Sequence, residues 1–493
     1  MKTKRNHRPV GIIDIGSNSI RLCVYDAATR VPVPLFNEKA VCSLAQGLES
    51  TGRLNPEGIA PSLLTIGRFI ELSLSMEVER LDILATAAVR DATDGVEFAQ
   101  AIEQRFGVVV HILSGGQEAH LSAMGVLCGA PDAKGIVCDL GGGSLELVSI
   151  DGGDFGEHVT LPLGVLRLAE ASGYDRAQAE TIVERHLSTL DWLDKGKNLT
   201  LYAVGGAWRA LARLSIAHTQ HPLTVLDNFT MDMAGALRIT HLVASQSRKS
   251  LEKLPGLSRK RVSTLPLAAQ VLEQIIERVS PKRLVFSIYG MREGRFYESL
   301  PDTLKAEDPL LSVCRQTALT NCRFPEHGDE VMAWMSPLFP DESPHDARLR
   351  HAACLLSDTF WNEHPDYRAE QAFLRTLRLP YMGVPHEERV AIALTVFIRY
   401  QGNEDELQFK GAYALMDETT LERCRIMGVA LRLAHTLSGG APNLLRQTSI
   451  AKSGRELVLT VPADQPVWMV DPDRSFDRLT RLLGCETMVV RRA

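Results

Sequence analysis

The stretch DIGSNSIRLCVYD, residues 14–26, is repeated in altered form as DLGGGSLELVSID, residues 139–151, at a constant offset of 125 residues. Each copy follows a short apolar run and continues into an alternating one, which predicts a hairpin with the glycine-bearing loop at its tip. A loop that occurs twice in register indicates two similar half-domains that face each other across a cleft. The positions shared by the two copies are Asp14 and Asp139, Gly16 and Gly141, Ser19 and Ser144, Leu22 and Leu147, and Asp26 and Asp151.

The glycines of the two loops allow backbone N–H groups to converge on an anion, and the hydroxyls of Ser17, Ser19 and Ser144 add donors. An acid at the end of the first strand would hold Mg²⁺, or a water bound to it, against phosphate oxygens, because hard cations take oxygen ligands. Each loop alone would also fit an ordinary tight turn whose Gly and Asn accept a positive φ. The register of the two copies, each with its acid, favours the anion site.

The composition is that of an ordinary globular protein that does not attract polyanions as a whole. The chain has 493 residues, 45% hydrophobic and 23% charged, and this length predicts about three domains. Because the formal net charge is −6, an anionic substrate would need basic residues gathered in a cleft. We expect a cytoplasmic protein, since no apolar run spans a bilayer, the basic start lacks a signal-peptide core, and the nine cysteines form no CxxC pair.

Two successive α/β patterns predict the half-domains, one at residues 1–121 and one at residues 122–300. The strand signals then fade, and we expect residues 301–493 to form a mainly α-helical domain, with helices over 331–435 and then strand, strand and helix over 455–483. The other expected elements are strands at 10–13, 81–85, 108–113, 201–204 and 283–287, a hairpin at 136–150, and helices at 61–77, 95–106, 176–193 and 207–214.

Two charged residues fall where predicted strands end. Arg90 follows the strand 81–85 in ATAAVRDA, where its guanidinium would fork onto phosphate oxygens or would be a plain surface arginine. Glu118 follows the glycine pair of LSGGQEAH and opens a helix, so its carboxylate would orient an attacking water. An acid in the first turn of a helix is also common because of the helix dipole alone.

Two further glycine-bearing stretches belong to the same set. LPLGVLR carries Gly164 and Arg167, and AVGGAWRAL carries Gly205 and Gly206 between a strand and a helix. A glycine pair at such a place permits the close approach of a flat or anionic ligand, although the ordinary start of a helix explains it as well.

Seven motifs in this order resemble the exopolyphosphatase and guanosine pentaphosphate phosphohydrolase (Ppx/GppA) family over the first 300 residues. They are DIGSNS, ATAAVRDA, SGGQEA, DLGGGSLE, LPLGVLR, VGGAWRALARL and, from Tyr289, YGMREG. The resemblance implies an α/β fold of the actin-like ATPase superfamily, with two duplicated, ribonuclease H-like half-domains, followed here by the mainly α-helical C-terminal domain.

The resemblance also implies hydrolysis of a terminal phosphoanhydride, which needs an in-line water, a metal and positive charge for the spreading oxygen charge. By position, Glu118 resembles the catalytic base and Arg90 a phosphate clamp, while Asp139, Glu118 and Asp14 resemble the ligands of Mg²⁺. A requirement for K⁺ stays open. The residues that resemble the phosphate and substrate site are Asp14, Gly16, Ser17, Asn18, Ser19, Arg21, Gly141, Gly142, Gly143, Ser144, Gly164, Arg167, Gly205 and Gly206.

Two positions depart from the family pattern. Gln117 stands where the family commonly has a second acid beside the base, which weakens the case for metal binding at both positions. In longer members the C-terminal region resembles HD phosphohydrolases, but here ACLLSD ends in Ser357 and Asp358 and lacks the histidine of the pair. We therefore expect a degenerate HD-like domain with a structural, substrate-holding or dimer-forming role.

Two substrates fit this resemblance. The first is long inorganic polyphosphate, which a basic stretch would hold beyond the cleft, unless that stretch is a solvated face. The second is the 5′-triphosphate end of pppGpp, which needs a guanine pocket that no motif identifies. The basic stretch comprises Arg248, Lys249, Lys253, Arg259, Lys260 and Arg261.

An ATPase or kinase of the same superfamily, or a nucleotide sensor without turnover, is a different class. The chain shows no acceptor-site motif, which speaks against a kinase, and its acids and Arg90 speak against a pure sensor. We expect a homodimer that binds neither a nucleic-acid polymer nor a membrane.

Overall fold

The computed structural model describes residues 9–26, 29–253, 262–401, 410–463 and 473–492. The chain divides into two compact units, Met1–Ala306 and Glu307–Ala493. The boundary that we predicted between residues 300 and 301 lies close to this division.

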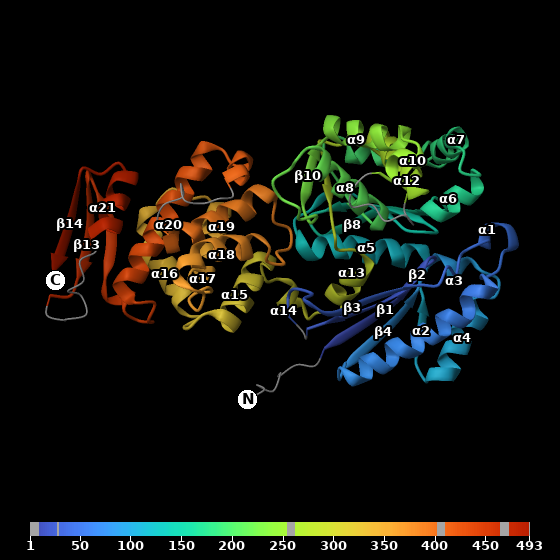
Figure 1. The fold of residues 1–493 in the computed structure, drawn as a ribbon, viewed down its shortest axis with the longest axis horizontal. Helices are drawn as coiled ribbons and strands as arrows, with labels where there is room; N and C mark the ends of the chain where they lie inside the picture. The colour runs from blue at the N-terminus through green and yellow to red at the C-terminus, as the bar shows by residue number, and fades with distance from the viewer. Residues whose placement is uncertain (1–8, 27–28, 254–261, 402–409, 464–472, 493) are drawn as a thin grey trace. The chain divides into compact units, whose positions relative to one another are not determined.

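The first sheet of the N-terminal unit has the strand order β3-β2-β1-β4-β5 (Figure 1). β1 pairs antiparallel with β2 and parallel with β4, and β4 pairs parallel with β5. The predicted hairpin with residues 16–18 at its tip is therefore confirmed. The strands are β1 (Val10–Ile15), β2 (Ser19–Tyr25), β3 (Pro34–Val41), β4 (Arg80–Ala85) and β5 (Val110–Ile112).

The second sheet repeats the first and adds one edge strand. Its order is β10-β11-β9-β6-β7-β8, so that β8-β7-β6-β9-β11 corresponds to β3-β2-β1-β4-β5 with the same strand directions. The repeat in sequence is thus a repeat in topology, and the expected fold class is confirmed. The strands are β6 (Lys134–Leu140), β7 (Leu145–Asp151), β8 (Asp154–Leu161), β9 (Thr200–Val204), β10 (Phe229–Asp232) and β11 (Arg283–Phe286).

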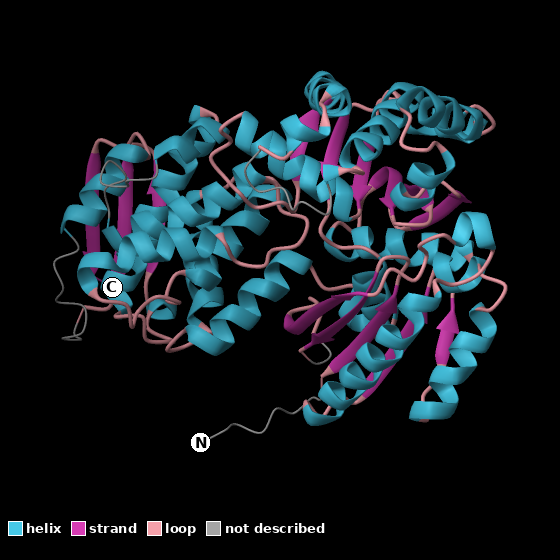
Figure 2. Ribbon diagram, turned by 45° about the vertical axis from the view of Figure 1, so that its right-hand side comes forward, coloured by secondary structure: helices cyan, strands magenta, loops and turns pink. Residues whose placement is uncertain are grey.

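Helices flank the strands of both sheets (Figure 2). α2 (Pro56–Ser75) shows how the sequence specifies them: the Asn55 side chain caps its first turn, and Ile66, Phe69 and Ile70 recur at helical spacing on its buried face. Burying one such side chain contributes roughly 1.5–3 kcal/mol, so this stripe fixes the helix on the sheet. α4 (Gly95–Phe106) matches the predicted helix residue for residue.

α5 (Gly115–Gly129) and α13 (Met291–Glu298) pack on each other between the two sheets (Figure 1). α5 rests on β7 and β8, so the predicted domain boundary after residue 121 falls inside a helix that belongs with the second sheet. The predicted helix 176–193 is shorter than expected, because α7 ends at Leu187 and a 3₁₀ turn follows at Asp191–Gly196. The remaining helices of this unit are α1 (Leu48–Thr51), α3 (Ala87–Asp91), α6 (Val165–Ala171), α7 (Arg176–Leu187), α8 (Gly206–His218), α9 (Met233–Ser245), α10 (Arg248–Leu251), α12 (Leu265–Val279) and α14 (Asp302–Lys305).

The C-terminal unit is mainly helical, as expected, and ends in a small three-stranded sheet of order β12-β13-β14. The predicted run of strand, strand and helix over 455–483 was wrong in its limits: β12 (Ser449–Ser453) starts earlier, and β14 (Thr487–Arg492) follows α21 (Asp473–Leu482) and pairs parallel with β13 (Glu456–Val461). The helices before this sheet are α15 (Pro309–Asn321), α16 (His327–Met335), α17 (Pro344–Leu356), α18 (Pro365–Leu377), α19 (His386–Gln401) and α20 (Glu418–Ser438).

All nine cysteines are free thiols, and eight of them are buried. Among the helices in the described ranges, none combines the length and apolarity that a bilayer crossing requires.

The two half-domains touch where the twin hairpin loops meet. A Cβ at residue 142 would lie 3.1 Å from the Cβ of Ser17, and one at residue 143 would lie 2.8 Å from Ser17 Oγ and 3.0 Å from the Cβ of Ala87. Glycine at these places is therefore required by close packing across the cleft.

Gly143→Ala should lower the midpoint of thermal unfolding of the full-length protein. The added methyl group has to displace Ala87 or Ser17, and overpacking of this kind costs about 1–3 kcal/mol. Gly411→Ala is the matched control, because no atom lies within 4 Å of the added Cβ. An unchanged midpoint in the Gly143 variant would mean that the loops do not pack this closely.

Candidate active site

The twin loops share one backbone geometry. The N–H of Gly16 donates to the carbonyl of Ser19 at 3.1 Å, and the N–H of Gly141 donates to the carbonyl of Ser144 at 3.0 Å. No residue in the segments 16–19 and 141–144 has a positive φ, so the explanation of these glycines as left-handed turn residues is wrong. Gly142 and Gly143 instead serve the close approach of their loop to Ser17, and each loop follows directly after a strand whose last residue but one is an acid, Asp14 in β1 and Asp139 in β6.

Glu118 and Arg90 form an ion pair near these loops. α5 starts at the N-cap Ser114, whose hydroxyl accepts from the N–H of Gln117 while the Gln117 side chain accepts from the N–H of Ser114. Gln117 thus closes a capping box, which is a structural use for the departure from the family pattern. Glu118 Oε2 accepts from Arg90 Nη1 at 2.8 Å, and Arg90 Nε donates to Asp91 Oδ1 at 3.0 Å.

Burial raises the pKa of Glu118 to about 7, although Arg90 lowers it and Asp139 and Asp14 raise it further. The Glu118 side chain is only 13% exposed. A carboxyl group with a pKa in this range exchanges a proton near neutral pH, which is what a general base requires. The geometry therefore supports the predicted role of Glu118.

Glu146 is a site residue that the sequence reasoning missed. It pairs directly with Asp139 across the hairpin, is 2% exposed, and leaves its Oε1 without a hydrogen-bond partner among the described residues. Burial, followed by Glu118 and Asp139, raises its pKa well above the usual value, while a hydrogen bond from Ser144 opposes the shift. The offset of 125 aligns Arg21 with Glu146, so the opposite charge at this position was a signal that the repeat itself offered.

The two strand-end acids have different partners. Asp139 accepts a hydrogen bond from Ser122 Oγ at 2.5 Å, and burial raises its pKa although that bond opposes the shift. Asp14 lies 3.9 Å from Arg292 Nε, and burial raises its pKa in spite of Arg292 and Arg21. Both carboxylates therefore carry negative charge that their protein partners compensate only in part.

The donor set fits a divalent cation such as Mg²⁺. Asp139 raises the pKa of Asp14, and both carboxylates raise the pKa of Glu118, so a cation between the three would relieve that repulsion. No three His, Cys, Asp or Glu side chains in the described ranges form a complete metal site by themselves. Mg²⁺ is commonly held by one or two carboxylates together with waters and substrate phosphates, so an incomplete protein site agrees with this ion.

Three arginines gather at the same cleft. Burial, followed by Arg292, lowers the pKa values of both Arg21 and Arg209, that of Arg209 to about 10. The guanidinium groups of Arg21 and Arg209 make no hydrogen bond or ion pair with another described residue. Neighbouring guanidinium groups that repel one another and lack acceptors leave positive charge for an anionic ligand. The sequence predicted Arg21, but it missed Arg209 and Arg292 although both stand inside quoted motifs.

Other predicted site residues have structural contacts of their own. Ser17 and Ser144 are 5% and 3% exposed, and the carbonyl of Asn18 accepts from the N–H groups of residues 42 and 43. A Cβ at residue 164 would lie 2.3 Å from the carbonyl carbon of Gly143, and Gly205 has a φ of 116°. These two glycines are therefore fixed by close packing and by conformation, whatever ligand the site holds.

Arg167 links the two half-domains instead of standing free for phosphate. Its Nε donates to Glu49 Oε2 at 2.7 Å and its Nη1 donates to Asp91 Oδ2 at 2.8 Å. To bind a phosphate group, Arg167 would have to leave these carboxylates.

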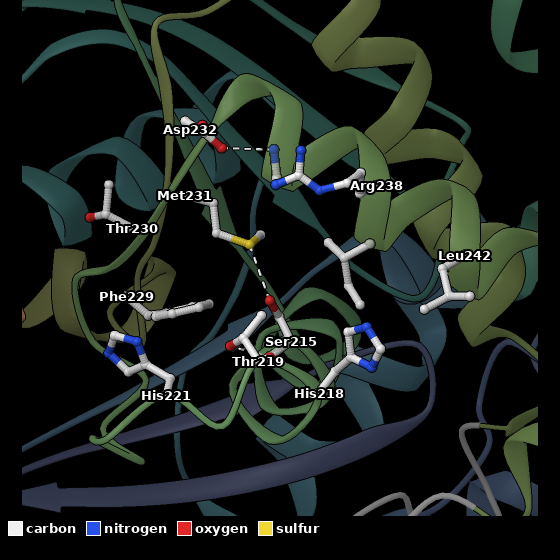
Figure 3. A pocket seen from close by; sticks show the side chains of 12 residues that line it. Ser215, His218, Thr219, His221, Phe229, Thr230, Met231, Asp232, Arg238 and Leu242 are labelled. Carbon is white, nitrogen blue, oxygen red and sulfur yellow. Dashed lines mark hydrogen bonds between the residues drawn. The ribbon is translucent and has the colours of Figure 1, made fainter. Parts of the chain in front are cut away.

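A cavity of about 400 Å³ lies elsewhere in this unit, among α8, β10 and α9, and is lined by residues such as His218, Phe229 and Arg238 (Figure 3). It contains none of the predicted site residues and stands at the far end of α8 from Gly206. Of the predicted basic stretch, Arg259, Lys260 and Arg261 lie outside the described residues, and Lys249 lies on α10.

Comparison with known proteins assigns the chain to a family. The model of the Ppx/GppA phosphatase family matches residues 23–303, and the model of the exopolyphosphatase C-terminal region matches residues 310–490. The chain belongs to the Ppx/GppA phosphatase family, whose members hydrolyse phosphoanhydrides.

Particular relatives share the N-terminal unit. Exopolyphosphatase 1 of Mycobacterium tuberculosis is 26% identical over 307 residues, which cover 59% of this chain and 88% of the relative. Exopolyphosphatase 1 of Mycobacterium leprae is 26% identical over 314 residues. Among solved structures, an exopolyphosphatase from Cytophaga hutchinsonii superposes with a TM-score of 0.54 and 22% identity, over 60% of this chain and 99% of that one. The Ppx/GppA family member of Aquifex aeolicus gives a TM-score of 0.52 and 24% identity, over 60% and 98% of the two chains.

Glu118→Gln should lower kcat for phosphate release by about 10²–10⁴-fold, the usual contribution of a general base, while substrate binding is largely kept. Steady-state kinetics and a separate binding measurement check this. Glu97→Gln is the matched control, because Glu97 is an exposed acid in the first turn of α4. Full activity of the Glu118 variant would remove the base assignment.

Arg90→Ala should move the acid limb of the pH profile of kcat/KM to higher pH. Glu118 is inactive as a base below its pKa, and Arg90 lowers that pKa, so its removal requires a higher pH for the same activity. Loss of a charge-assisted contact should also reduce kcat/KM by about 10- to 100-fold. Arg53→Ala, at an exposed arginine of the same half-domain, is the control. A limb that stays in place would show that Arg90 does not set the proton affinity of Glu118.

Proposed function

We propose that this protein is an exopolyphosphatase that removes the terminal phosphate of inorganic polyphosphate by attack of water. The observation that carries the proposal is the environment of Glu118. This carboxyl group is buried, has a pKa of about 7, accepts a hydrogen bond from Arg90, and lies near enough to Asp14 and Asp139 for both to raise its pKa. The names of the relatives above support the substrate class, since they are exopolyphosphatases.

In the proposed reaction, Glu118 takes a proton from the attacking water, whose oxygen forms a bond to the terminal phosphorus. The bridging P–O bond then breaks, and the shortened chain leaves with the electron pair. Arg90 faces the same carboxylate and stabilises charge on the phosphoryl oxygens, because a guanidinium presents several donors at once. Arg21, Arg209 and Arg292 provide the local positive charge that a chain with net charge −6 has to supply for a polyanion.

Mg²⁺ is the cofactor that we propose, held by Asp139 and Glu118 with Asp14 close by. When bound, it would neutralise the negative charge on the phosphate oxygens. Whether K⁺ is needed stays a prediction to be tested by ion replacement. The homodimer and the cytoplasmic location also stay predictions, the first open to a measurement of molar mass in solution.

The alternative substrate is pppGpp, whose 5′-triphosphate end would present the same chemistry to the same loops. An ATPase, a kinase or a sensor without turnover differs from both, because it would not release free phosphate from polyphosphate in the absence of an acceptor.

Phosphate release should be observed from long-chain polyphosphate with Mg²⁺, and should be lost when the ion is chelated. The same assay with pppGpp separates the two substrates by their kcat/KM values, with the Glu118→Gln variant as the blank. Phosphate release from pppGpp but not from polyphosphate would show that pppGpp is the substrate. Release from neither compound would contradict the proposed function.

A further inference from the structure

The C-terminal unit contains a second concentration of arginines, around a cavity of about 340 Å³. The cavity lies among the start of α18, the end of α19 and α20, and we call it the Arg399 cavity. Three guanidinium groups line it, those of Arg368, Arg399 and Arg432, together with the imidazole of His435. All four residues belong to Glu307–Ala493, so the C-terminal unit alone supplies them.

Of these arginines, Arg399 has the fewest hydrogen-bond partners for its guanidinium group within the described residues. Its side chain is 14% exposed, its Nε is buried without a hydrogen-bond partner among the described residues, and its guanidinium stacks 4.0 Å above the ring of Tyr400. Its Nη2 comes no closer than 3.8 Å to Asp358. A buried donor without an acceptor destabilises the folded protein, and an anion that binds the Arg399 guanidinium would offset that cost.

The other two arginines use backbone carbonyls and lack carboxylate partners within the described ranges. Arg432 Nη1 donates to the carbonyl of Tyr400 at 2.6 Å, and Arg368 donates to the carbonyl of Glu363 at 2.9 Å and 3.1 Å. Burial, followed by Arg478, lowers the pKa of Arg432. These contacts orient the two guanidinium groups but leave their positive charge unneutralised.

The nearest carboxylate, that of Asp358, is already occupied. Arg323 binds both of its oxygens, with Nε at 2.9 Å from Oδ2 and Nη2 at 2.7 Å from Oδ1. Asp358 therefore balances Arg323 and has little left for Arg399. The acid of the degenerate pair Ser357–Asp358 acts here as a partner for guanidinium groups.

His435 reports the same excess of positive charge. Burial, followed by Arg399, His327 and Arg323, lowers its pKa well below the usual value. Its Nε2 lies 2.9 Å from Ser357 Oγ, while its Nδ1 is buried without a partner among the described residues. The imidazole is thus held neutral chiefly by its burial and further by the positive charges around it.

We propose that the Arg399 cavity binds a phosphate oxyanion, either free phosphate or the end of a short phosphate chain. Guanidinium groups bind the oxygens of phosphate in pairs, and three of them converge on a space large enough for such a group. The proposal does not rest on the proposed function, because none of its residues belongs to the unit that carries Glu118.

The binding test uses the full-length protein with Glu118→Gln, so that a chain ligand stays intact during titration calorimetry. Tripolyphosphate should bind at two sites per chain. Adding Arg399→Met should remove one of them or weaken it by about 10- to 100-fold, the effect of losing a charge-assisted hydrogen bond. Adding Arg21→Gln in place of Arg399→Met should weaken the other site, so that failure at the cleft and failure at the Arg399 cavity are distinguished.

Two controls keep the test decisive. Arg455→Gln removes one exposed arginine of the same unit and should leave both sites unchanged. Arg432→Gln is a second cavity variant, for use if circular dichroism shows that Arg399→Met unfolds the unit. Separate titrations with inorganic phosphate and with tripolyphosphate show whether the free ion or the chain end is the ligand.

Crystals of the full-length protein soaked in tungstate, a heavy analogue of phosphate, would locate the ion directly. An anomalous peak within hydrogen-bond distance of Arg399 and Arg432 is expected, and it should be absent in the Arg399→Met protein. Binding that is equal in the cavity variants and the parent, or a peak only at the N-terminal loops, would overturn the proposal.

Discussion

The contact between the twin hairpin loops is the constraint on which the N-terminal unit depends. Residues 142 and 143 approach Ser17 so closely that a side chain at either position would force a neighbouring atom to shift. Each loop follows a strand whose last residue but one is an acid, so packing the loops together also brings Asp14 and Asp139 to one cleft. The close packing that joins the half-domains thereby also places negatively charged carboxylates near one another in a buried site.

Several carboxylates are buried there against very few direct partners. Burial raises the pKa values of Glu118, Asp139 and Glu146. Glu118 and Asp139 raise the pKa of Glu146 further. Arg90 stabilises the Glu118 carboxylate by a direct hydrogen bond. Arg21 lowers the pKa of Asp14 and Arg209 lowers that of Asp139 by the electrostatic field alone, without a hydrogen bond. This distribution leaves room for a cation among the acids and for an anion among the arginines, and a phosphoanhydride bound with Mg²⁺ presents both charges together.

The sequence predicted those features that depend on local pattern and repeat. The hairpins, α4 and the repeat of the α/β pattern followed from apolar periodicity and from the offset between Asp14 and Asp139, whereas the order of the strands in each sheet did not. Glu118 and Arg90 were named one by one from strand and helix ends, but their direct bond depends on how α3 and α5 pack. Arg209 and Arg292 were missed for the same reason, since they reach the cleft from α8 and α13, whose placement no local pattern encodes.

Ser357 and Asp358 of the C-terminal unit, which the sequence comparison set against the pair of HD phosphohydrolases, have structural partners of their own. Sequence reasoning noted that Ser357 replaces a histidine, and from that alone it inferred a structural, substrate-holding or dimer-forming role. In the structure Ser357 binds His435 of α20, and Asp358 binds Arg323 of the segment between α15 and α16, so the polar groups that remain are satisfied by side chains from elsewhere in the unit. Arg399 then stands in surroundings that are already positive, with its Nε unmatched among the described residues. A buried arginine that destabilises the folded protein in this way is most simply explained by a ligand that supplies the missing negative charge.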